Sequence, residues 1–481
     1  MPISLRTHVK RRVRPPAAVL RVIRLNNGFQ LLFNLLWWMP VFYQYQKQAG
    51  LSDSQIFGIQ SVYYVAFCLL EIPTGFIADR IGQRRCMQLG AAAMTAANLL
   101  PVFSPSFVGF MAHFLAIAAA RSLVSGASSA YLYEYLHEHA ADDHYVQAEG
   151  TARALGLWAK IACWPLVGVL MHVRHEAPYV LTALSTLGSL ACAAALPAIA
   201  APRGGGHPPA ERVGLLDSAR QAAKVLGTSR SLGPLMVQGV AVFTLARICQ
   251  VNLFQPLLLE KDLPVADHGA VLSAMTVAEA VGAARTGWLR SRLSDTTVVS
   301  VLSVVMALTL AATTLSGGLG TILWLCVFAA AVGLAYPVQR NLINAAIPPT
   351  PYRATLLSVE SIIDRGVCAL VALAVGAYLA ADRLDALLVH AAAGTCLLLL
   401  VAGVVLGRGA AGRRSALIRR DGRARRPDPG VEDAEGVGAR HQSRGASPRR
   451  VRRAAGTRGS PGPGATDPGR WRWLRWTGRP P

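Results

Sequence analysis

Long apolar segments recur along this chain of 481 residues, and they constrain its fold more than any other feature. A helix needs roughly 20 mainly apolar residues to cross about 30 Å of hydrocarbon. Only 15% of the residues are charged, against about 25% in a typical soluble protein. The sequence therefore predicts twelve membrane-spanning segments, at residues 20–44, 55–78, 86–104, 107–129, 150–172, 177–199, 233–257, 267–290, 297–316, 319–341, 354–379 and 383–406.

These segments are expected to be helices. They lack the strict alternation of barrel strands, and every backbone polar group in lipid must be hydrogen-bonded within the protein. The fold class that we expect is an all-α membrane protein. Residues 1–19 form a basic arm, and because no short apolar region with a cleavage site opens the chain, we expect no cleaved signal peptide.

Other local patterns indicate no cofactor and no metal. The eight cysteines are scattered singly, almost all within or at the ends of the spans, and are interpreted as small packing residues. The stretch "HEHAADDH" at 137–144 resembles a metal-binding tract, but it lies in a predicted loop, where a solvated acidic segment is the simpler interpretation. No phosphate-binding loop is present, so no nucleotide is expected.

The basic residues of the loops predict the orientation of the chain. With the N-terminus in the cytoplasm, eighteen Lys and Arg residues fall in cytoplasmic loops and four in loops on the opposite side. An excess of Lys and Arg is typical of the cytoplasmic loops of membrane proteins. We therefore expect both termini in the cytoplasm, and the protein in the cytoplasmic membrane.

A linker by composition, "APRGGGHPPAERVG", divides the spans six and six. It leads into residues 215–227, whose apolar positions share one face of a helix that would lie at the membrane surface. The predicted organisation is a basic arm at 1–19, a six-helix bundle at 20–199, a cytoplasmic linker at 200–232, a second six-helix bundle at 233–406 and a tail at 407–481.

The tail holds nineteen arginines against six acidic residues and so carries more than half of the formal charge of +22. It lacks hydrophobic periodicity and is expected to be disordered. The stretch "RWRWLRW" at 470–476 would also suit stacking on bases or contact with anionic headgroups. We favour a solvated tail or a loose membrane contact over nucleic-acid binding, and a frame-shifted extension of the reading frame stays open.

A charged turn between the second and third spans is the most specific motif. In "EIPTGFIADRIGQRR" it places an acid, bases and glycines between two apolar runs, and this pattern resembles the signature of the major facilitator superfamily. The matching positions are Gly75, Asp79, Arg80, Gly82, Arg84 and Arg85. Physically, the glycines permit a tight turn, and the arginines hold the loop in the cytoplasm.

The resemblance implies a latch. In the superfamily this turn contacts the other half of the protein, and here Asp79 would face the N-terminus of the helix that begins just after residues 348–355. A turn that serves only topology is the alternative. The segment "GWLRSRLSD" at 287–295 resembles a degraded repeat of the same motif in the second half.

Other segments resemble the bacterial permeases of the superfamily and favour its drug-efflux-like branch, with two departures. Proton-driven exporters carry an Arg in the fourth span followed four residues later by Gly, whereas here Gly126 follows Arg121 by five residues. Antiporters carry Gly-Pro-x-x-Gly-Gly in the fifth span, whereas this chain has "WPLVGV" at 164–169. Export remains favoured, though less strongly than with complete motifs.

Ionisable side chains inside predicted spans are costly unless they face a cavity or a partner. A carboxylate shielded from water can take up and release a proton as access alternates. We favour Glu279 and Asp364 for this role, with structural ion pairs as the alternative. The proton-coupling candidates are Glu71, Arg121, Arg247, Glu279, Glu360 and Asp364, and Lys160 and Arg365 are further ionisable residues in spans.

Polar residues recur at helical spacing in the first and seventh spans. The resemblance implies that these two helices line a central cavity, whereas helix packing is the alternative. The substrate-contact candidates are Asn27, Gln30, Asn34, Trp38, Gln250 and Asn252.

The predicted function is secondary active transport of a small organic solute by alternating access, outward in exchange for protons. Proton-coupled uptake of a sugar or other metabolite is the first alternative. A non-transporting membrane sensor that uses the arginine-rich tail as its output is the second. The expected partners are a small-molecule substrate, protons and membrane lipid, with no nucleic acid, no enzymatic activity and a monomeric state.

Overall fold

The computed structural model describes residues 16–199, 232–347 and 353–424. Within the helices, the side chains of Ile72, Gly75, Phe76, Asp79 and of residues 353–359 and 405–424 are not described. The predicted interfacial helix at 215–227 and the tail beyond residue 424 lie outside the described residues. The chain divides into a unit of residues 1–419, which holds both predicted bundles, and a unit of residues 420–481.

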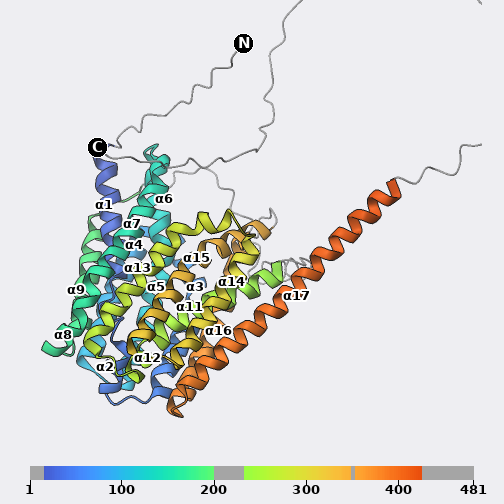
Figure 1. Ribbon diagram of the computed structural model, residues 1–481. Helices are drawn as coiled ribbons and strands as arrows, with labels where there is room; N and C mark the ends of the chain where they lie inside the picture. Colours follow the sequence, from blue (N-terminus) through green and yellow to red (C-terminus); the bar gives the residue numbers. More distant parts are fainter. Residues whose placement is uncertain (1–15, 200–231, 348–352, 425–481) are drawn as a thin grey trace, which may run out of the picture. The chain divides into compact units, whose positions relative to one another are not determined.

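The described residues are folded into helices and short connections, with no strand among them (Figure 1). The first half comprises α1 (Ala17–Asn34), α2 (Phe42–Gln48), α3 (Asp53–Ile81), α4 (Gln83–Phe103), α5 (Phe107–Ser125), α6 (Ala127–Glu138), η1 (Asp142–His144), α7 (Tyr145–Cys163), η2 (Trp164–Leu166), α8 (Val167–Val173) and α9 (Ala177–Ala195). The second half comprises α11 (Leu232–Arg247), the π-helix η3 (Ile248–Leu253), α12 (Phe254–Glu260), α13 (Val265–Arg290), α14 (Asp295–Thr314), α15 (Gly318–Ala346), α16 (Arg353–Ala380) and α17 (Leu384–Ala424).

In the described residues, nine helical segments are long and apolar enough to cross a membrane, which indicates a multi-pass membrane protein. They are Gln83–Phe103, Phe107–Glu138, Asp142–Val173, Ala177–Ala195, Leu232–Glu260, Asp295–Thr314, Gly318–Ala346, Glu360–Ala380 and Leu384–Val404. The other three predicted spans coincide with the helices α1, α3 and α13. For these three, membrane crossing stays a prediction.

The first predicted span, 20–44, is not one continuous helix. α1 ends at Asn34, and a non-helical segment precedes α2. Pro40 lies in this break and has no backbone N–H with which to continue a helix. The freed backbone groups find side-chain partners: Trp37 N donates to Thr182 Oγ1 at 3.0 Å, and Trp164 Nε1 donates to Leu36 O at 3.0 Å. The break is thus held by α9 and η2.

The charged turn is shorter than the sequence predicts. α3 runs to Ile81 and α4 begins at Gln83, so that Gly82 alone separates the two helices. Its φ of +86° lies in the region that favours glycine, which explains the residue type at this position. Gly75 and Asp79 belong to α3 rather than to a loop.

The last helix extends past the predicted boundary at residue 406. α17 continues to Ala424 through a stretch rich in alanine and arginine, "GAAGRRSALIRRDGRA". Both residue types have high helix propensity, which outweighs the glycines there. The predicted disorder of the tail therefore does not hold for residues 408–424.

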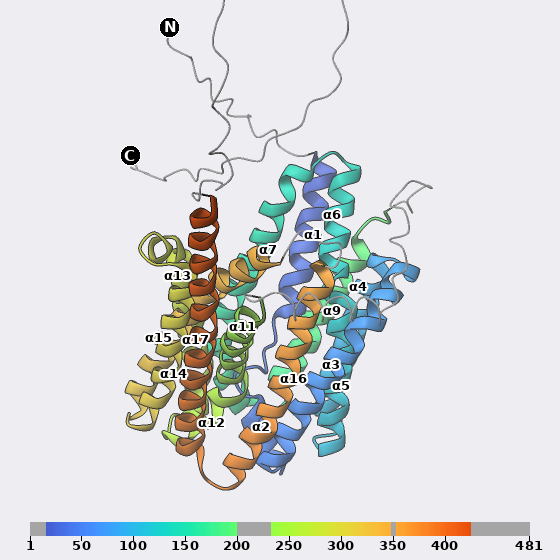
Figure 2. The same ribbon diagram turned by 90° about the vertical axis from the view of Figure 1, so that its right-hand side faces the viewer.

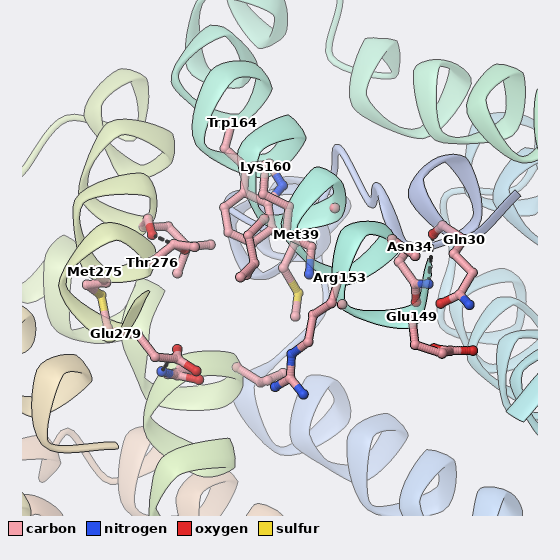
Figure 3. A pocket seen from close by; sticks show the side chains of 17 residues that line it. Gln30, Asn34, Met39, Glu149, Arg153, Lys160, Trp164, Met275, Thr276 and Glu279 are labelled. Carbon is pink, nitrogen blue, oxygen red and sulfur yellow. Dashed lines mark hydrogen bonds between the residues drawn. The ribbon is translucent and has the colours of Figure 1, made fainter. Parts of the chain in front are cut away.

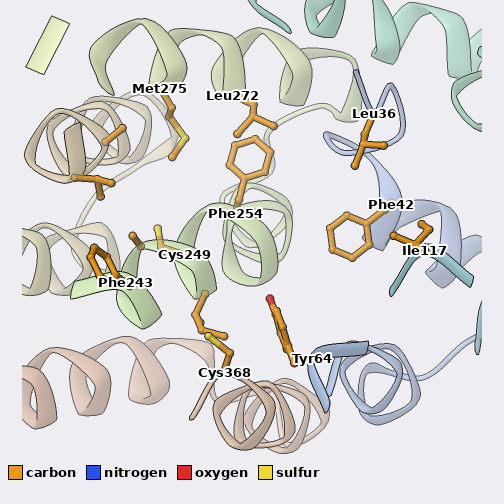
Figure 4. Packing of buried hydrophobic residues seen from close by; sticks show 14 of the residues in the cluster. Leu36, Phe42, Tyr64, Ile117, Phe243, Cys249, Phe254, Leu272, Met275 and Cys368 are labelled. Atoms are coloured by element: carbon orange, nitrogen blue, oxygen red, sulfur yellow. The ribbon is translucent and has the colours of Figure 1, made fainter. Parts of the chain in front are cut away.

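The two halves pack on each other mainly at two places. α3 lies beside α16, as Figure 2 shows, and α13 lies against α7, η2 and α8. Buried apolar residues of both halves belong to one cluster (Figure 4), to which Leu36 and Phe42 contribute from the first half and Phe254 and Leu272 from the second. Because lipid tails are as apolar as these side chains, close packing rather than removal of surface from water stabilises the contact within the membrane.

Candidate functional site

A cavity of about 750 Å³ lies between the two halves. Its walls come from α1 and α7 of the first half and from η3 and α13 of the second (Figure 3). Polar and charged side chains supply much of its lining, which is unusual for residues between membrane helices. These side chains are Gln30, Asn34, Glu149, Arg153, Lys160, Gln250, Thr276 and Glu279, beside Met39, Trp164 and Met275.

One face of α7 supplies the charges of the first wall. Glu149, Arg153, Lys160 and Trp164 follow one another at spacings of four, seven and four residues, which places them on the same side of a helix. The Lys160 ammonium lies 5.6 Å from the centroid of the Trp164 ring, a cation–π contact. Arg153 and Lys160 have no carboxylate within 4 Å among the described residues.

The amide side chains of α1 border the same wall. Asn34 Nδ2 donates to the backbone oxygen of Gln30 at 2.8 Å. The side-chain nitrogen of Gln30 is buried and has no hydrogen-bond partner among the described residues, and neither has Glu149 Oε1. Buried polar atoms are normally paired, so these two atoms have unused hydrogen-bonding capacity at the cavity.

Glu279 of α13 is the acidic group of the opposite wall. Its Oε2 accepts a hydrogen bond from Gln250 Nε2 of η3 at 3.0 Å. The charged groups that act on it most are Lys160 and Arg153 of α7, across the cavity. From α15, Gly333 packs against the backbone oxygen of Glu279, and this close approach requires a residue without a Cβ.

Three predicted substrate contacts do not line this cavity. Asn27 and Asn252 are buried in the packed interior, and Asn252 Oδ1 accepts from Tyr64 OH at 3.1 Å across the two halves. Trp38 Nε1 donates to Asn98 Oδ1 at 2.7 Å within the first half. The helix-packing interpretation therefore describes these three, whereas Gln30, Asn34 and Gln250 do face the cavity.

The remaining proton-coupling candidates lie outside the cavity lining. Asp364 Oδ2 accepts from Arg247 Nη2 at 3.0 Å and its Oδ1 from Thr244 Oγ1 at 3.1 Å, which links α11 to α16. Glu360 Oε2 accepts from Arg340 Nη1 at 3.0 Å, which links α16 to α15. Both carboxylates thus have a permanently charged partner.

Two further candidates have no ion pair. Glu71 and Arg121 are half-buried and, within the described part of the chain, make no side-chain hydrogen bond or ion pair. Arg365, the basic neighbour of Asp364, stacks on the Phe67 ring of α3 with its guanidinium carbon 4.0 Å from the centroid. This contact joins α16 to α3 across the two halves.

Contacts between the halves close the cavity at the end that is predicted to be extracellular. Gln255 of α12 is fully buried there; its Oε1 accepts from Tyr43 N at 3.0 Å and its Nε2 donates to Met39 O at 3.0 Å. Gly168 of α8 lies against the backbone of Ala266, and Gly269 of α13 against the backbone oxygen of Trp164. The closure therefore depends on direct approach of the two backbones.

The chain also matches a known family. The profile of the Major Facilitator Superfamily matches residues 28–363, more than half of the chain. The chain belongs to the Major Facilitator Superfamily. A search among curated proteins finds no relative that matches the sequence.

Solved structures of major facilitator proteins share the fold. The nucleoside transporter NupG, as a mutant, is 13% identical with a TM-score of 0.70, and the alignment covers 81% of this chain and 99% of that one. A POT family transporter in complex with a thioalcohol-conjugated peptide is 14% identical with a TM-score of 0.62, and the alignment covers 81% of this chain and 96% of that one. At such identity the likeness describes the fold alone.

The signature turn of the superfamily is only partly visible. Arg84 Nη2 donates to the backbone oxygen of Ala194 at 2.8 Å and so ties the turn to α9 of its own half, whereas Arg80 and Arg85 are exposed. The side chain of Asp79 and residues 348–352 lie outside the described residues. The latch between Asp79 and the start of α16 therefore stays a prediction.

The degraded repeat of the turn is stabilised by a different contact. Arg290 donates from Nε and Nη2 to the two carboxylate oxygens of Asp295, at 2.8 Å each, and so clamps the connection between α13 and α14. This bidentate geometry is the preferred pairing of a guanidinium with a carboxylate. The predicted histidine-rich tract likewise forms a local pair, between His137 Nδ1 and Asp142 Oδ1 at 2.9 Å.

The sequence analysis missed two charged residues of the cavity, Glu149 and Arg153. Both lie at the start of the fifth predicted span, where a charge is normally attributed to the membrane boundary. Their spacing from Lys160 and Trp164 in the sequence could have identified them, because residues four or seven positions apart lie on the same face of a helix.

Proposed function

We propose that this member of the superfamily moves a small polar organic solute across the membrane by alternating access, and that Glu279 carries the proton to which transport is coupled. The observation that carries the proposal is the polar cavity between the halves, closed at one end by contacts between them. A cavity of this size holds a small organic molecule. The nucleoside and peptide named for the two similar transporters are solutes of this kind.

Alternating access requires that the contacts between the halves can separate. Besides the shared apolar cluster and the packing of α3 on α16, the halves are joined by hydrogen bonds and close backbone contacts. These are Gln255 to the α1–α2 break, Tyr64 to Asn252, and the two glycine contacts, with no ion pair between the halves among the described residues. Each such hydrogen bond contributes about 0.5–1.5 kcal/mol. Differences of this size are within what a bound solute can offset, so its binding can shift the population between the two states.

Among the acidic candidates, Glu279 suits proton carriage best. It lies in the cavity and its hydrogen-bond donor is a neutral amide, Gln250, whereas Asp364 and Glu360 are each paired with an arginine. A carboxylate without a permanent cationic partner can gain and lose a proton without breaking an ion pair. The positive groups that face it are Lys160 and Arg153, both on the other half.

The direction of transport is part of this proposal. We favour export in exchange for protons, because several segments resemble the drug-efflux-like branch although the exporter motifs of the fourth and fifth spans are incomplete. Uptake with protons is the alternative. The sign of the solute flux in membrane vesicles of known orientation, under an imposed pH gradient, distinguishes the two.

Replacement of Glu279 by Gln is expected to make transport independent of the pH gradient. The amide keeps the shape of the side chain but cannot bind or release a proton, so the ratio of rates with and without a gradient should fall to about one. Glu279→Asp should retain the gradient dependence. The measurement uses purified protein in proteoliposomes and those solutes that raise its melting temperature in a screen of drugs, sugars, amino acids and siderophores.

Two results would count against the proton carrier. If the unmodified protein transports at the same rate after collapse of the gradient, protons are not the coupling ion. If Glu279→Gln keeps the gradient dependence, the carrier is another carboxylate, and Asp364→Asn, Glu71→Gln and Glu360→Gln are measured in the same way.

A further inference from the structure

Opposite charges face each other across the cavity from the two halves of the protein. Arg153 and Lys160 line it from α7 of the first half, where Glu149 lies one turn before Arg153, and Glu279 lines it from α13 of the second (Figure 3). No ion pair within 4 Å joins these groups among the described residues. The first wall thus carries two bases and one acid, a net positive charge, and it faces the acidic Glu279 of the second wall.

Lys160 and Glu279 attract each other across the cavity, but neither has a close ionic partner among the described residues. Lys160 has only the Trp164 ring as a described contact, and Glu279 has only the amide of Gln250. Lys160 and Glu279 are half-buried, whereas Arg153 is exposed. Partial withdrawal of a charge from water without a close ionic partner is costly, and a ligand of opposite charge offsets that cost. A solute that carries both a negative and a positive group would therefore gain the most binding free energy at this site.

We propose, on the basis of the transport function proposed above, that the solute is a small zwitterion whose carboxylate binds Lys160 and Arg153 and whose ammonium group binds Glu279. Gln30 of α1 lines the cavity from the same half as Lys160 and Arg153, and its side-chain nitrogen has no hydrogen-bond partner among the described residues. The side chains of Met39 and Met275 contact the uncharged part of the solute.

Other classes of solute fit the two walls less well. An anion would meet Lys160 and Arg153 but place negative charge opposite Glu279, and a cation would do the reverse. A neutral solute would leave both walls without ionic partners while it displaced their water. Only a molecule with both charges satisfies the two walls together.

Such a solute would also act on the conformational equilibrium. Its two ends bind side chains of different halves, so that it favours the state in which α7 and α13 approach each other around it. Because the same carboxylate of Glu279 binds either a proton or the ammonium group, the two compete. Competition for one site is the condition for exchange of solute against protons.

The first experiment varies the solute. Leucine, glutamine and alanyl-alanine are each compared with their N-acetyl derivatives, which keep only the negative charge, and with their carboxamides, which keep only the positive charge. Uridine serves as an uncharged solute. We expect at least one zwitterion to bind the detergent-solubilised protein, with its two derivatives at least about tenfold weaker, since each loses a charge-assisted hydrogen bond.

The second experiment varies the protein. Lys160→Gln should weaken binding of the zwitterion about tenfold, to the affinity of the carboxamide, and should change the affinity of the carboxamide little. Glu279→Gln should likewise weaken binding of the zwitterion about tenfold, to the affinity of the N-acetyl derivative, and should change the affinity of that derivative little. Lys160→Arg should restore binding. Lys261→Gln and Glu260→Gln remove the same charges outside the cavity and should leave all affinities unchanged.

The outcomes separate this inference from the transport function. If uridine binds as tightly as the zwitterions, or a singly charged derivative as tightly as its parent zwitterion, and that solute is moved into proteoliposomes, the inference is wrong and the proposed transport function is retained. If none of the tested solutes binds or is transported, both the inference and the proposed transport function are wrong. Because the comparison of derivatives uses the unmodified protein, it decides even if a variant does not fold.

Discussion

Replacement of Asp364 by Asn is expected to lower the free energy of unfolding by about 3 kcal/mol, the largest effect on stability among the variants considered. Only 6% of the Asp364 side chain is exposed, and its partner Arg247 is 32% exposed. Removal of one partner of a buried ion pair costs about 3–5 kcal/mol, because the other charge is left without compensation. The partial exposure of Arg247 places the expected cost at the lower end.

A second ion pair on the same helix supplies the matched control. The Glu360 side chain is 2% exposed, but its partner Arg340 is 47% exposed and can be solvated alone. Glu360→Gln is therefore expected to cost about 1 kcal/mol or less. Thermal unfolding in detergent, followed by tryptophan fluorescence, measures both variants, the single variant Arg247→Gln and the double variant Arg247→Gln/Asp364→Asn. Equal losses for Asp364→Asn and Glu360→Gln, or additivity of the Arg247 and Asp364 changes, would contradict the structural role of the pair.

Nine of the twelve spans coincide with helices long and apolar enough to cross a membrane in the described residues, and they were predictable because the requirement for them is local. Twenty apolar residues identify a membrane helix whatever surrounds it, and the predicted positions coincide with helical segments along both halves. The interruptions were not predictable in the same way. The break before α2 depends on Thr182 and Trp164, which lie more than 120 residues away in sequence and satisfy backbone groups that Pro40 leaves free.

The cavity was predictable in part, for a similar reason. Gln30, Asn34, Gln250 and Glu279 were found because polar residues inside spans require a partner or a cavity. Trp38 and Asn252 satisfied the same criterion, yet the structure pairs them with Asn98 and Tyr64 in the packed interior. Spacing alone places a residue on a helix face, and tertiary packing decides whether that face lines the cavity.

Replacement of Gly269 by Ala is expected to open the closed end of the protein with little effect on its folding. A Cβ at this position would overlap the backbone oxygen of Trp164, which belongs to the other half. Backbone cannot give way as a flexible side chain can, and such overpacking costs about 1–3 kcal/mol. The overlap exists only when the halves meet at this end, so the cost destabilises only the state that is closed there. The ratio of the closed to the open population should therefore fall by about 5- to 150-fold.

Gly333 supplies the control because its contact lies within one half. A Cβ there would overlap the backbone oxygen of Glu279, which packs α13 on α15 of the same half in every state of the cycle. Gly333→Ala is therefore expected to lower the melting temperature, whereas Gly269→Ala should lower it less. Gly168→Ala, which places a Cβ against Ala266 across the halves, should behave like Gly269→Ala.

Access of a reagent to the cavity distinguishes the glycines between the halves, Gly269 and Gly168, from Gly333 within one half. Thr276→Cys places a thiol in the cavity wall, and a membrane-impermeant thiol reagent added on the predicted extracellular side labels it only when that end is open. The eight native cysteines supply the background, which is measured without Thr276→Cys. Labelling should rise in Gly269→Ala and Gly168→Ala and stay low in Gly333→Ala. Equal labelling in all three would mean that the close approach of α13 to η2 and α8 does not control access to the cavity. The closure would then depend on the remaining contacts between the halves, among them the hydrogen bonds of Gln255.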